Sequence, residues 1–402
     1  MEIHVKESTI IRPAHETPKH CLKNSELDLL VPSIHVPGVY FYRRPNNSSD
    51  FFEAGLLKEA LSKVLVPYYP MAGRLGRAEN GKFIDINCNG EGVLFMEAET
   101  TCVIDDLGDF ESNTILLKLV PNVDSTKDIS SCPLLVTQVT HFKCGGASLG
   151  IGVYHTLADA TSVFHFINAW AEMTHGISIS NFPFIDRTVL EIGVPTFDQI
   201  NTLKAKSKEN YRPTNTINFT RFEILAAHIW RCLCKARGLS NDQVSKLYFP
   251  INGRSRLNPP LPSGYFGNVI FPGTSLALSG DIISEPLNST CERIHKALMR
   301  MDDEYLKSAL AYFKQLPDVM VLRRGSHTFK CPNLNVSNLC HMCIYDANFG
   351  WGRPMFFRPI AVSDGVGFIL PSPNNDGSLY LVINLETPRI QLFRKFFYEI
   401  LV

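Results

Sequence analysis

Two residues four positions apart, His155 and Asp159, are the pair in this sequence whose types and spacing most readily indicate chemistry. An imidazole titrates near neutral pH, so it can take a proton from a hydroxyl group or bind a metal ion. A metal site would need a further ligand close by, and the neighbouring sequence supplies none. The Gly-x-Ser-x-Gly motif of a nucleophilic serine is matched only loosely, at 146–150. The residues leave two interpretations open, a buried histidine satisfied by hydrogen bonds and a general base.

The predicted elements around His155 would hold it at the junction of a strand and a helix. Apolar runs predict strands over 134–142 and 147–154, with a glycine pair between them. Beyond Asp159, apolar residues recur three or four apart and predict an amphipathic helix, for which Asp159, Thr161 and Ser162 are candidate N-caps. A side chain at such a junction is held rigidly and can reach into a cleft.

Helices and strands intermix throughout the chain, which predicts an α/β or α+β fold with two layered sheets. Helices are expected over 51–65, with Asp50 as the N-cap, and over 220–236, 292–315 and 388–401. Short strands are expected over 27–31 and 38–42, and further strands over 247–251, 337–345 and 379–385. At 402 residues, two domains are the expected organisation.

Composition and charge exclude several classes of partner. Lys plus Arg and Asp plus Glu both number 39, so the balanced charge gives no reason to expect nucleic acid or an anionic membrane. The N-terminus lacks the layout of a signal peptide, and no apolar run approaches the roughly 20 residues that span a bilayer. The 11 scattered cysteines favour reduced thiols and a cytoplasmic location. Cys340 and Cys343 have redox spacing but no accompanying pair, so thiols without a metal are expected there.

Three motifs resemble those of the plant BAHD acyltransferases, in the order that the family shows. They are the His-x-x-x-Asp motif at 155–159, Tyr265-Phe266-Gly267-Asn268, and Asn348-Phe349-Gly350-Trp351-Gly352, which is similar to the family's Asp-Phe-Gly-Trp-Gly. Further runs are similar to the hydroxycinnamoyl-CoA:shikimate/quinate hydroxycinnamoyltransferase branch, at 6–9, 68–75, 184–188 and 330–334. The resemblance covers nearly the whole chain.

The resemblance implies an α/β fold of two similar-sized domains with mixed β-sheets and flanking helices, like chloramphenicol acetyltransferase subunits. An N-terminal acyltransferase domain at 1–190 would carry the His-x-x-x-Asp motif, followed by a crossover at 191–218 and a C-terminal acyltransferase domain at 219–402. A coenzyme A thioester and an alcohol would enter a channel between them from opposite faces. His155 would take the proton of the alcohol, which attacks the thioester. No permanently bound cofactor and no metal are implied.

The same resemblance assigns roles to residues around His155. Trp351 would donate its indole N–H to the oxyanion, with a core aromatic as the alternative interpretation. Asp159 would face away from His155 and pair with an arginine, which would hold the junction. The carboxylate of the Asp-Phe-Gly-Trp-Gly motif would pair with Arg254 or Arg256, whose alternative interpretation is solvated loop charge. Gly350 and Gly352 belong to the same structural motif.

This chain departs from the family pattern at three structural positions. Asn348 stands where the motif has aspartate, and an amide cannot neutralise an arginine, at an expected cost of about 1–3 kcal/mol. Ala160 stands where glycine is usual, which matters only if that position requires a positive φ. The crossover near 194–201 is shorter than is usual in the family.

The acceptor side also differs from the branch. The branch would hold the carboxylate of its acceptor with an arginine, and the matching position here is His341. The branch has hydroxyl-bearing residues at two positions that are Val36 and Gly38 in this chain, whereas His35 and Tyr40 are the same as in the branch. Because a histidine holds a carboxylate less surely than a bidentate arginine, a hydroxyphenyllactate-like alcohol, as in rosmarinic acid synthases, is an alternative acceptor.

The sequence therefore predicts a cytoplasmic, monomeric, acyl-CoA-dependent O-acyltransferase. It would move a hydroxycinnamoyl group to a shikimate- or quinate-like alcohol, with these small molecules as its partners. Two alternatives stay open. One is a catalytically impaired homologue that keeps the fold and binds ligands, which the departures at Asn348, Ala160 and the crossover motivate. The other is transfer to an amine, which acidic side chains around the acceptor would favour.

Overall fold

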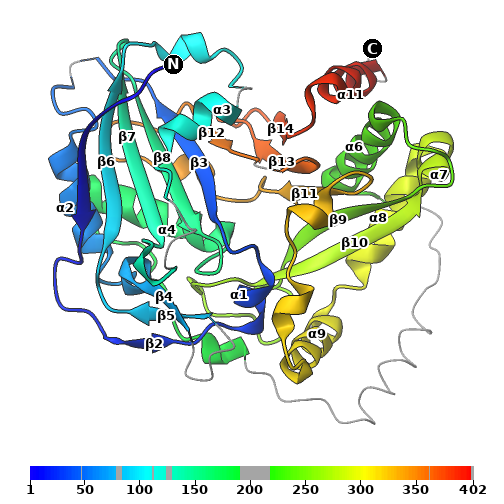
Figure 1. The fold of residues 1–402 in the computed structure, drawn as a ribbon, viewed down its shortest axis with the longest axis horizontal. Coiled ribbons are helices and arrows are strands. Elements are labelled where there is room, and N and C mark those ends of the chain that lie inside the picture. Colours follow the sequence, from blue (N-terminus) through cyan, green and yellow to red (C-terminus); the bar gives the residue numbers. More distant parts are fainter. Residues whose placement is uncertain are drawn as a thin grey trace.

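The computed structural model of the chain describes residues 1–46, 48–77, 84–110, 113–123, 129–190, 218–361 and 363–399. It has two halves, each built on a mixed sheet with helices against it, which confirms the predicted α/β class (Figure 1). The predicted crossover lies outside the described residues except for its last residue. The stretch near 194–201, which is expected to be short, lies outside them entirely.

The N-terminal half is organised around a six-stranded sheet. Its strands, in spatial order, are β1 (His4–Ile11), β6 (Val93–Thr100), β7 (Leu135–Phe142), β8 (Ala147–Tyr154), β3 (His35–Tyr42) and β12 (Phe356–Pro359). β7 and β8 pair antiparallel as neighbours, as the glycine pair between them predicts, whereas β6 and β7 are parallel. A smaller sheet consists of β2 (His20–Leu22), β5 (Ile84–Cys88) and β4 (Arg74–Arg77).

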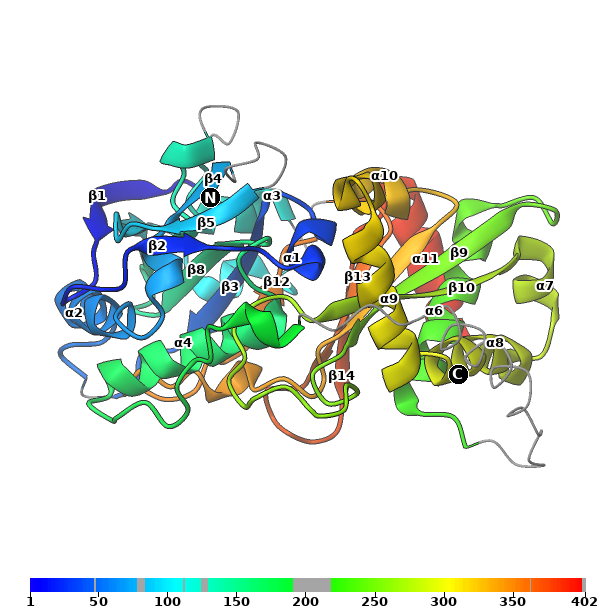
Figure 2. The same cartoon turned by 90° about the horizontal axis from the view of Figure 1, so that it is seen from below.

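Two helices, α2 (Ala54–Val64) and α4 (Ala160–Thr174), pack against the six-stranded sheet (Figure 2). Their apolar side chains and those of the strands form one core cluster. Trp170 of α4 is fully buried there and donates its indole N–H to the carbonyl of Leu57 at 3.0 Å. The core therefore fixes α4, and with it the turn that precedes this helix.

The C-terminal half is organised around a five-stranded sheet. Its strands, in spatial order, are β10 (Ile270–Leu278), β9 (Val244–Asn252), β11 (Leu334–Asn338), β13 (Val366–Pro371) and β14 (Leu379–Ile383). Its helices are α6 (Arg221–Arg237), α7 (Ser279–Ser284), α8 (Leu287–Met299), α9 (Asp303–Gln315), α10 (Ser326–Phe329) and α11 (Thr387–Glu399). Trp230 of α6 is fully buried and donates to the hydroxyl of Ser245 at 2.8 Å, which ties α6 to the sheet.

Several short helical turns connect these elements. One is the α-helix α3 (Asn113–Leu116). The others are 3-10 helices: η1 (Tyr69–Ala72), η2 (Ile104–Leu107), η3 (Leu117–Leu119), η4 (Ile129–Ser131), η5 (Arg187–Leu190), η6 (Val319–Leu322) and η7 (Ile344–Asp346).

Each half lends one short element to the other. β12 follows the second sheet's β11 in the chain but pairs antiparallel with β3, so Phe357 lies against Tyr40 with ring centroids 4.5 Å apart. In the other direction, α1 (Glu26–Leu30) places Leu27 and Leu29 in the core cluster of the C-terminal half. The domain bounds 1–190 and 219–402 therefore stay a prediction, because each core contains a piece from the other half.

Some predicted elements are wrong in type or extent. The stretch 27–31, expected as a strand, is the helix α1, which Ser25 and Asp28 begin with a reciprocal capping box. The N-cap of α2 is Glu53 and not Asp50, because the Glu53 carboxylate accepts two backbone N–H groups of the first turn. The expected helix 292–315 is divided into α8 and α9, and Asp302 caps the second. The expected strand 337–345 ends at Asn338 and continues as turns. Several observed strands, among them β2, β4, β10, β12 and β13, have no counterpart among the predicted elements.

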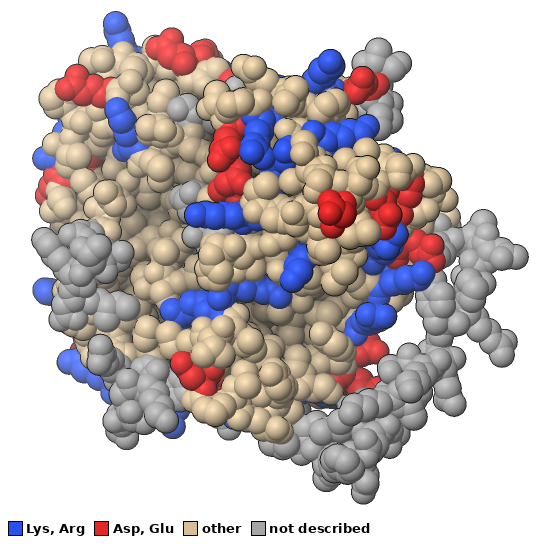
Figure 3. Space-filling model, turned by 45° about the vertical axis from the view of Figure 1, so that its right-hand side comes forward, with Lys and Arg blue, Asp and Glu red and all other residues tan. Residues whose placement is uncertain are grey.

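Figure 3 shows one face of the molecule, on which charged residues of both signs are mixed. Lys and Arg side chains are interspersed there with Asp and Glu, and wide areas of other residues separate them. Within the described part of the chain, no helix combines the length and the apolar character that crossing a membrane requires.

Candidate active site

His155 directly follows the last residue of β8 and is fixed by its backbone. Its N–H donates to the carbonyl of Ile34 at 2.9 Å, which continues the pairing of β8 with β3 by one residue. Its carbonyl accepts a hydrogen bond from the side-chain amide of Asn268 at 2.9 Å. A tight turn then leads into α4. The predicted junction of strand, turn and helix is therefore confirmed.

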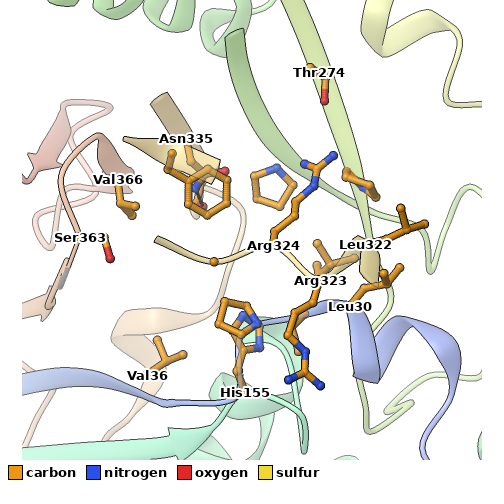
Figure 4. A pocket seen from close by; sticks show the side chains of 18 of the residues that line it. Leu30, Val36, His155, Thr274, Leu322, Arg323, Arg324, Asn335, Ser363 and Val366 are labelled. Atoms are coloured by element: carbon orange, nitrogen blue, oxygen red, sulfur yellow. Dashed lines mark hydrogen bonds between the residues drawn. The ribbon is translucent and has the colours of Figure 1, made fainter. Parts of the chain in front are cut away.

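The His155 side chain lines a cavity of about 1420 Å³ (Figure 4). The walls come from both halves: residues 30–37 on one side, and α8, α9, residues 320–329 and the strands of the second sheet on the other. A histidine in a sealed interior could not reach a substrate, whereas this imidazole borders a space large enough for one. The general-base interpretation therefore meets its first structural requirement.

Burial lowers the pKa of His155 below its ordinary value, because the apolar surroundings disfavour the imidazolium. The carboxylate of Asp159, the side chain of Asn268 and nearby backbone carbonyls act in the opposite direction but do not outweigh burial. Nδ1 is buried and has no hydrogen-bond partner among the described residues. Nε2 is therefore the ring nitrogen that can contact a molecule in the cavity. A neutral imidazole at neutral pH is the form that can accept a proton.

Asp159 turns away from His155 and holds the junction. Its carboxylate caps α4 by accepting the N–H of Ser162 at 3.1 Å, and it also accepts the N–H of Val269 at 3.0 Å. Arg254 meets it with two nitrogens at 2.7 and 3.0 Å, and the Asp159 side chain is only 1% exposed. The prediction that Asp159 pairs with an arginine is confirmed, and Arg254 is that arginine. The pair joins α4 to the loop after β9.

A second buried network lies beneath the same turn, and sequence reasoning did not assign it. Asp28 of α1 is fully buried and accepts hydrogen bonds from the backbone and side-chain N–H groups of Asn268, at 2.8 and 2.9 Å. Arg187 pairs with Asp28 at 3.1 Å and donates to the carbonyl of Leu157 at 2.7 Å. The runs at 184–188 and 265–268 marked Arg187 and Asn268 in the sequence, whereas nothing there marked Asp28.

Trp351 lies away from the cavity, which contradicts its expected role as oxyanion donor. Its indole N–H donates to the carboxylate of Asp50 at 3.3 Å. Its ring packs against Phe51 and Phe52, with centroid distances of 6.1 and 5.2 Å, and it does not line the cavity. The alternative interpretation, an aromatic packed at the edge of the core, describes Trp351 better.

Asn348 does not contact Arg254 or Arg256, so the expected pairing of this position with one of the two arginines is also wrong. Its side-chain oxygen accepts the N–H groups of Gly350 and Gly352 at 3.0 and 2.9 Å. Both glycines have φ near +100°, at 103° and 104°, which glycine tolerates best. Arg256 instead donates to carbonyls at the end of α8. An amide oxygen closes this turn as a carboxylate would, so the expected loss of an ion pair does not apply.

The other departure that the structure describes, Ala160, is also accommodated. It is the first residue of α4, and it is not among the described non-glycine residues with positive φ. A glycine is therefore not needed at this position. Ala160 helps to start the helix, for which alanine is well suited.

Of the residues expected to bind the acceptor, the structure places Val36 in the cavity and the other four outside its lining. The His35 ring contacts the carbonyl of Pro133 at 2.8 Å, and burial lowers its pKa. Gly38 and Tyr40 are buried under β12, where the ring of Phe357 leaves no room for a Cβ on Gly38. His341 is exposed on a turn. Four of the five, His35, Val36, Gly38 and Tyr40, lie on β3, but the sequence could not show how far along this strand the cavity extends.

The competing chemistries find no support in the described residues. Ser148 is the serine of the stretch 146–150 that loosely matches the nucleophile motif. It lies inside β8, and its hydroxyl is buried without a hydrogen-bond partner among the described residues. A catalytic elbow would instead place the serine on a turn between strand and helix. No group of three His, Cys, Asp or Glu among these residues is placed to hold a metal ion. None of the 11 cysteines forms a disulfide.

The chain matches the model of the Transferase family over residues 1–202 and 194–400. It therefore belongs to this family of plant BAHD acyltransferases, and it is an acyltransferase enzyme that uses an acyl-CoA co-substrate. The resemblance of its three motifs is confirmed.

Named relatives and solved structures agree with this assignment. Shikimate O-hydroxycinnamoyltransferase of Nicotiana tabacum is 49% identical, over 99% of this chain and 100% of the relative. Hydroxycinnamoyltransferase of Narcissus pseudonarcissus is 47% identical over 100% of both chains. A hydroxycinnamoyl-CoA:5-hydroxyanthranilate N-hydroxycinnamoyltransferase of Avena sativa is 44% identical, over 98% of this chain and 99% of the relative. The crystal structure of vinorine synthase is similar in fold, with a TM-score of 0.74 and 22% identity over 97% of this chain and 96% of that one.

Proposed function

We propose that this protein transfers a hydroxycinnamoyl group from its coenzyme A thioester to a shikimate- or quinate-like alcohol, with His155 as the general base. The observation that carries the proposal is the position of His155, whose imidazole borders a cavity between the two halves. The donor and acceptor classes come from the relatives, which are named as hydroxycinnamoyltransferases at 47–49% identity over nearly the full chain.

The reaction needs one proton to move twice. Nε2 of His155 accepts the proton of the acceptor hydroxyl while that oxygen attacks the thioester carbonyl carbon. The carbon–oxygen bond forms, and the negative charge moves to the carbonyl oxygen. When the carbonyl re-forms, the carbon–sulfur bond breaks and the imidazolium returns the proton to the leaving sulfur. A base in contact with the hydroxyl contributes about 10²–10⁴-fold in rate.

The surroundings of His155 suit this role. Because burial lowers its pKa, the imidazole is neutral at pH 7 and needs no prior deprotonation. Its main chain is held from two sides, by the carbonyl of Ile34 and the amide of Asn268. Asp159 is engaged with Arg254 and is not available to orient the ring. His155 therefore acts as a base whose position depends on its backbone.

The alternative of an impaired homologue loses most of its motivation. Asn348 closes a turn that an amide closes well, and Ala160 needs no positive φ. The amine alternative keeps some support from the Avena sativa relative, which is named as an N-hydroxycinnamoyltransferase. However, none of the described residues that line the cavity is Asp or Glu, so an aliphatic amine, which is cationic at neutral pH, would find no counter-charge there. An arylamine such as 5-hydroxyanthranilate has a neutral amino group, and the acceptor panel below tests it directly. An O-acyltransferase is the better-supported function.

The remaining assignments follow from composition and fold. We propose a monomer that works in the cytoplasm, consistent with 11 cysteines of which none forms a disulfide. The domains would be 1–190 and 219–402, joined by the crossover and by the exchange of α1 and β12.

The test is thiol release from p-coumaroyl-CoA in the presence of an acceptor panel. The panel contains shikimate, quinate, hydroxyphenyllactate and 5-hydroxyanthranilate, and a reaction without acceptor measures hydrolysis. We expect shikimate or quinate to give the highest kcat/KM. A highest kcat/KM for the amine acceptor, or release that no acceptor accelerates, would contradict the proposal.

A further inference from the structure

The charges that border the cavity are all of one sign. Among its described lining residues, Arg300, Arg323, Arg324 and His327 are basic or can become so, and none is Asp or Glu. A low-dielectric space bordered by one sign of charge attracts ligands of the opposite sign. The cavity therefore favours substrates that carry an anionic group.

Arg323 is the arginine whose guanidinium lies on the His155 side of this space. It follows η6 directly, and Figure 4 shows its side chain running toward the end of the cavity where His155 lies. It is also close enough to Tyr154, the residue before His155, for the two side chains to influence each other's pKa. A small acceptor with its hydroxyl at His155 would extend toward this guanidinium.

The Arg323 side chain is oriented but incompletely paired. Its Nε donates to the carbonyl of Leu29 at 3.1 Å, which fixes the plane of the guanidinium. Neither terminal nitrogen has a hydrogen-bond partner among the described residues, and of the two Nη2 is buried. Nη1 is thus the donor that remains for a ligand. Through Nη1, Arg323 can offer a carboxylate a charge-assisted hydrogen bond.

No carboxylate of the described chain neutralises Arg323. Burial lowers its pKa, which means that the cation is partly removed from water. Asp318 is the acidic group that opposes this effect, but its carboxylate accepts the N–H of Met320 at 2.8 Å and forms no ion pair with Arg323. A partly desolvated cation without an anionic partner is stabilised when a ligand supplies the anion.

The neighbouring cations are arranged differently. Arg324 runs in the opposite direction, toward Thr274, and its guanidinium lies over the ring of Tyr248 at 4.7 Å. Arg300 and His327 are exposed at the border of the cavity. His341, which sequence reasoning matched to a carboxylate-binding arginine, lies outside the lining.

We propose that Arg323 binds the carboxylate of the acceptor and so makes this acyltransferase selective for acidic alcohols. The proposal rests on the proposed function, since it assumes that the acceptor hydroxyl lies at His155. In this proposal the anionic group that binds Arg323 belongs to the acceptor. The phosphates of the coenzyme A donor are the other anionic groups that could bind there. Arg323 thereby replaces His341 as the residue expected to determine acceptor specificity.

The experiment compares Arg323→Gln with the matched variant Arg324→Gln, which removes the adjacent guanidinium from the same cavity. Each variant and the parent enzyme are assayed by thiol release with shikimate and with its methyl ester, and the KM for p-coumaroyl-CoA is measured separately. In Arg323→Gln we expect the KM for shikimate to rise about 10- to 100-fold, as loss of a charge-assisted hydrogen bond implies, with the KM for the ester unchanged. Arg324→Gln should keep the parent's preference for the acid.

Three results would overturn the proposal. They are an unchanged KM for shikimate in Arg323→Gln, an equal rise for acid and ester, and a rise in the KM for p-coumaroyl-CoA alone, which would place donor phosphate at Arg323. Calorimetric titration of shikimate into the three proteins with coenzyme A present tests the same contrast without turnover. If the parent enzyme bound shikimate through Arg323 but released no thiol, the proposed function would fail while the assignment of Arg323 held.

Discussion

At the scale of single residues, the proposed role of His155 as a general base depends on a buried imidazole without a carboxylate partner. Its buried Nδ1 has no carboxylate partner among the described residues, and the acid of the motif, Asp159, is engaged by Arg254. A carboxylate partner on Nδ1 would raise the pKa of the imidazole, whereas burial alone lowers it. The result is a base that is already neutral at physiological pH but weaker than one with a carboxylate behind it.

This arrangement predicts a particular dependence of activity on pH. In the proposed mechanism the neutral imidazole is the active form, and burial holds the pKa of His155 below the ordinary 6.5. We therefore expect kcat/KM to be constant from about pH 7 to 8 and to fall at lower pH, through an apparent pKa below that of free histidine. The measurement is the pH profile of thiol release with saturating donor. An apparent pKa above 6.5 would show that an unrecognised partner stabilises the imidazolium.

The sequence could predict His155 and Asp159 because their roles are local. His155 needs only the end of a strand, and Asp159 needs only to precede a helix, and both requirements are visible in the pattern of apolar residues. The partners of the junction were less visible. Asp28 is 240 positions from Asn268 in the chain, and a buried carboxylate looks like any other aspartate until the fold brings the two together. Trp351 was misplaced because a motif can be recognised without showing where its side chains point.

At the scale of elements, the turn between β8 and α4 is clamped from the opposite half. Asp159 caps α4 and at the same time receives Arg254 from the loop after β9. Arg187 and Asn268 bind the carbonyls of the same turn from other directions. The turn that carries His155 is therefore held by charged and polar groups from several segments, which is what the proposed base requires.

The clamp can be tested with Asp159→Asn. Asparagine is as good an N-cap as aspartate, so the variant removes the charge and leaves the cap. Arg254, whose side chain is 14% exposed, would then lack its counter-ion, and breaking a buried pair costs about 3–5 kcal/mol. We expect the free energy of unfolding in urea to fall by that amount.

The control for this variant is Arg43→Gln, which removes the partner of Asp105 from an ion pair whose side chains are 62% and 70% exposed. It should leave the unfolding midpoint nearly unchanged, because exposed pairs contribute little. Equal midpoint shifts in the two variants would mean that the Asp159–Arg254 pair is not a structural clamp.

Element prediction was best where local signals agree and weakest where tertiary contacts decide. β8 and α4 have clear apolar periodicity with a cap between them, and both formed as expected. The apolar run at 27–31 has the residues of a strand, but the capping box of Ser25 and Asp28 makes it a helix. β12 has four residues and exists because β3 offers it an edge, which no local pattern shows.

At the scale of the whole molecule, the cavity that His155 borders exists only when the two halves are joined. Its cavity has walls from both, and each half completes the core of the other. α1 contributes Leu27 and Leu29 to the C-terminal core, and in return β12 covers Tyr40 with Phe357. The exchange links the stability of each half to the geometry of the site between them.

We therefore predict that the segment 1–190 does not fold on its own. Without β12 it would expose the edge of β3 and the apolar surface that Phe357 covers, and the apolar face of α1 would have no partner. Produced alone, it should aggregate or show no cooperative thermal transition by circular dichroism. Co-expression with 218–402 should recover a folded complex. A sharp, reversible transition of 1–190 alone would contradict this view of the exchange.

The most direct measurement is the single-turnover rate of thiol release in His155→Gln, with donor and acceptor saturating. Glutamine can occupy the position and donate or accept a hydrogen bond, but it cannot take a proton. The account predicts a rate about 10²–10⁴-fold below that of the parent enzyme, while a thermal shift on adding p-coumaroyl-CoA shows that the variant still folds and binds donor. A rate equal to that of the parent enzyme would contradict it, because the proton would then leave the acceptor by another route.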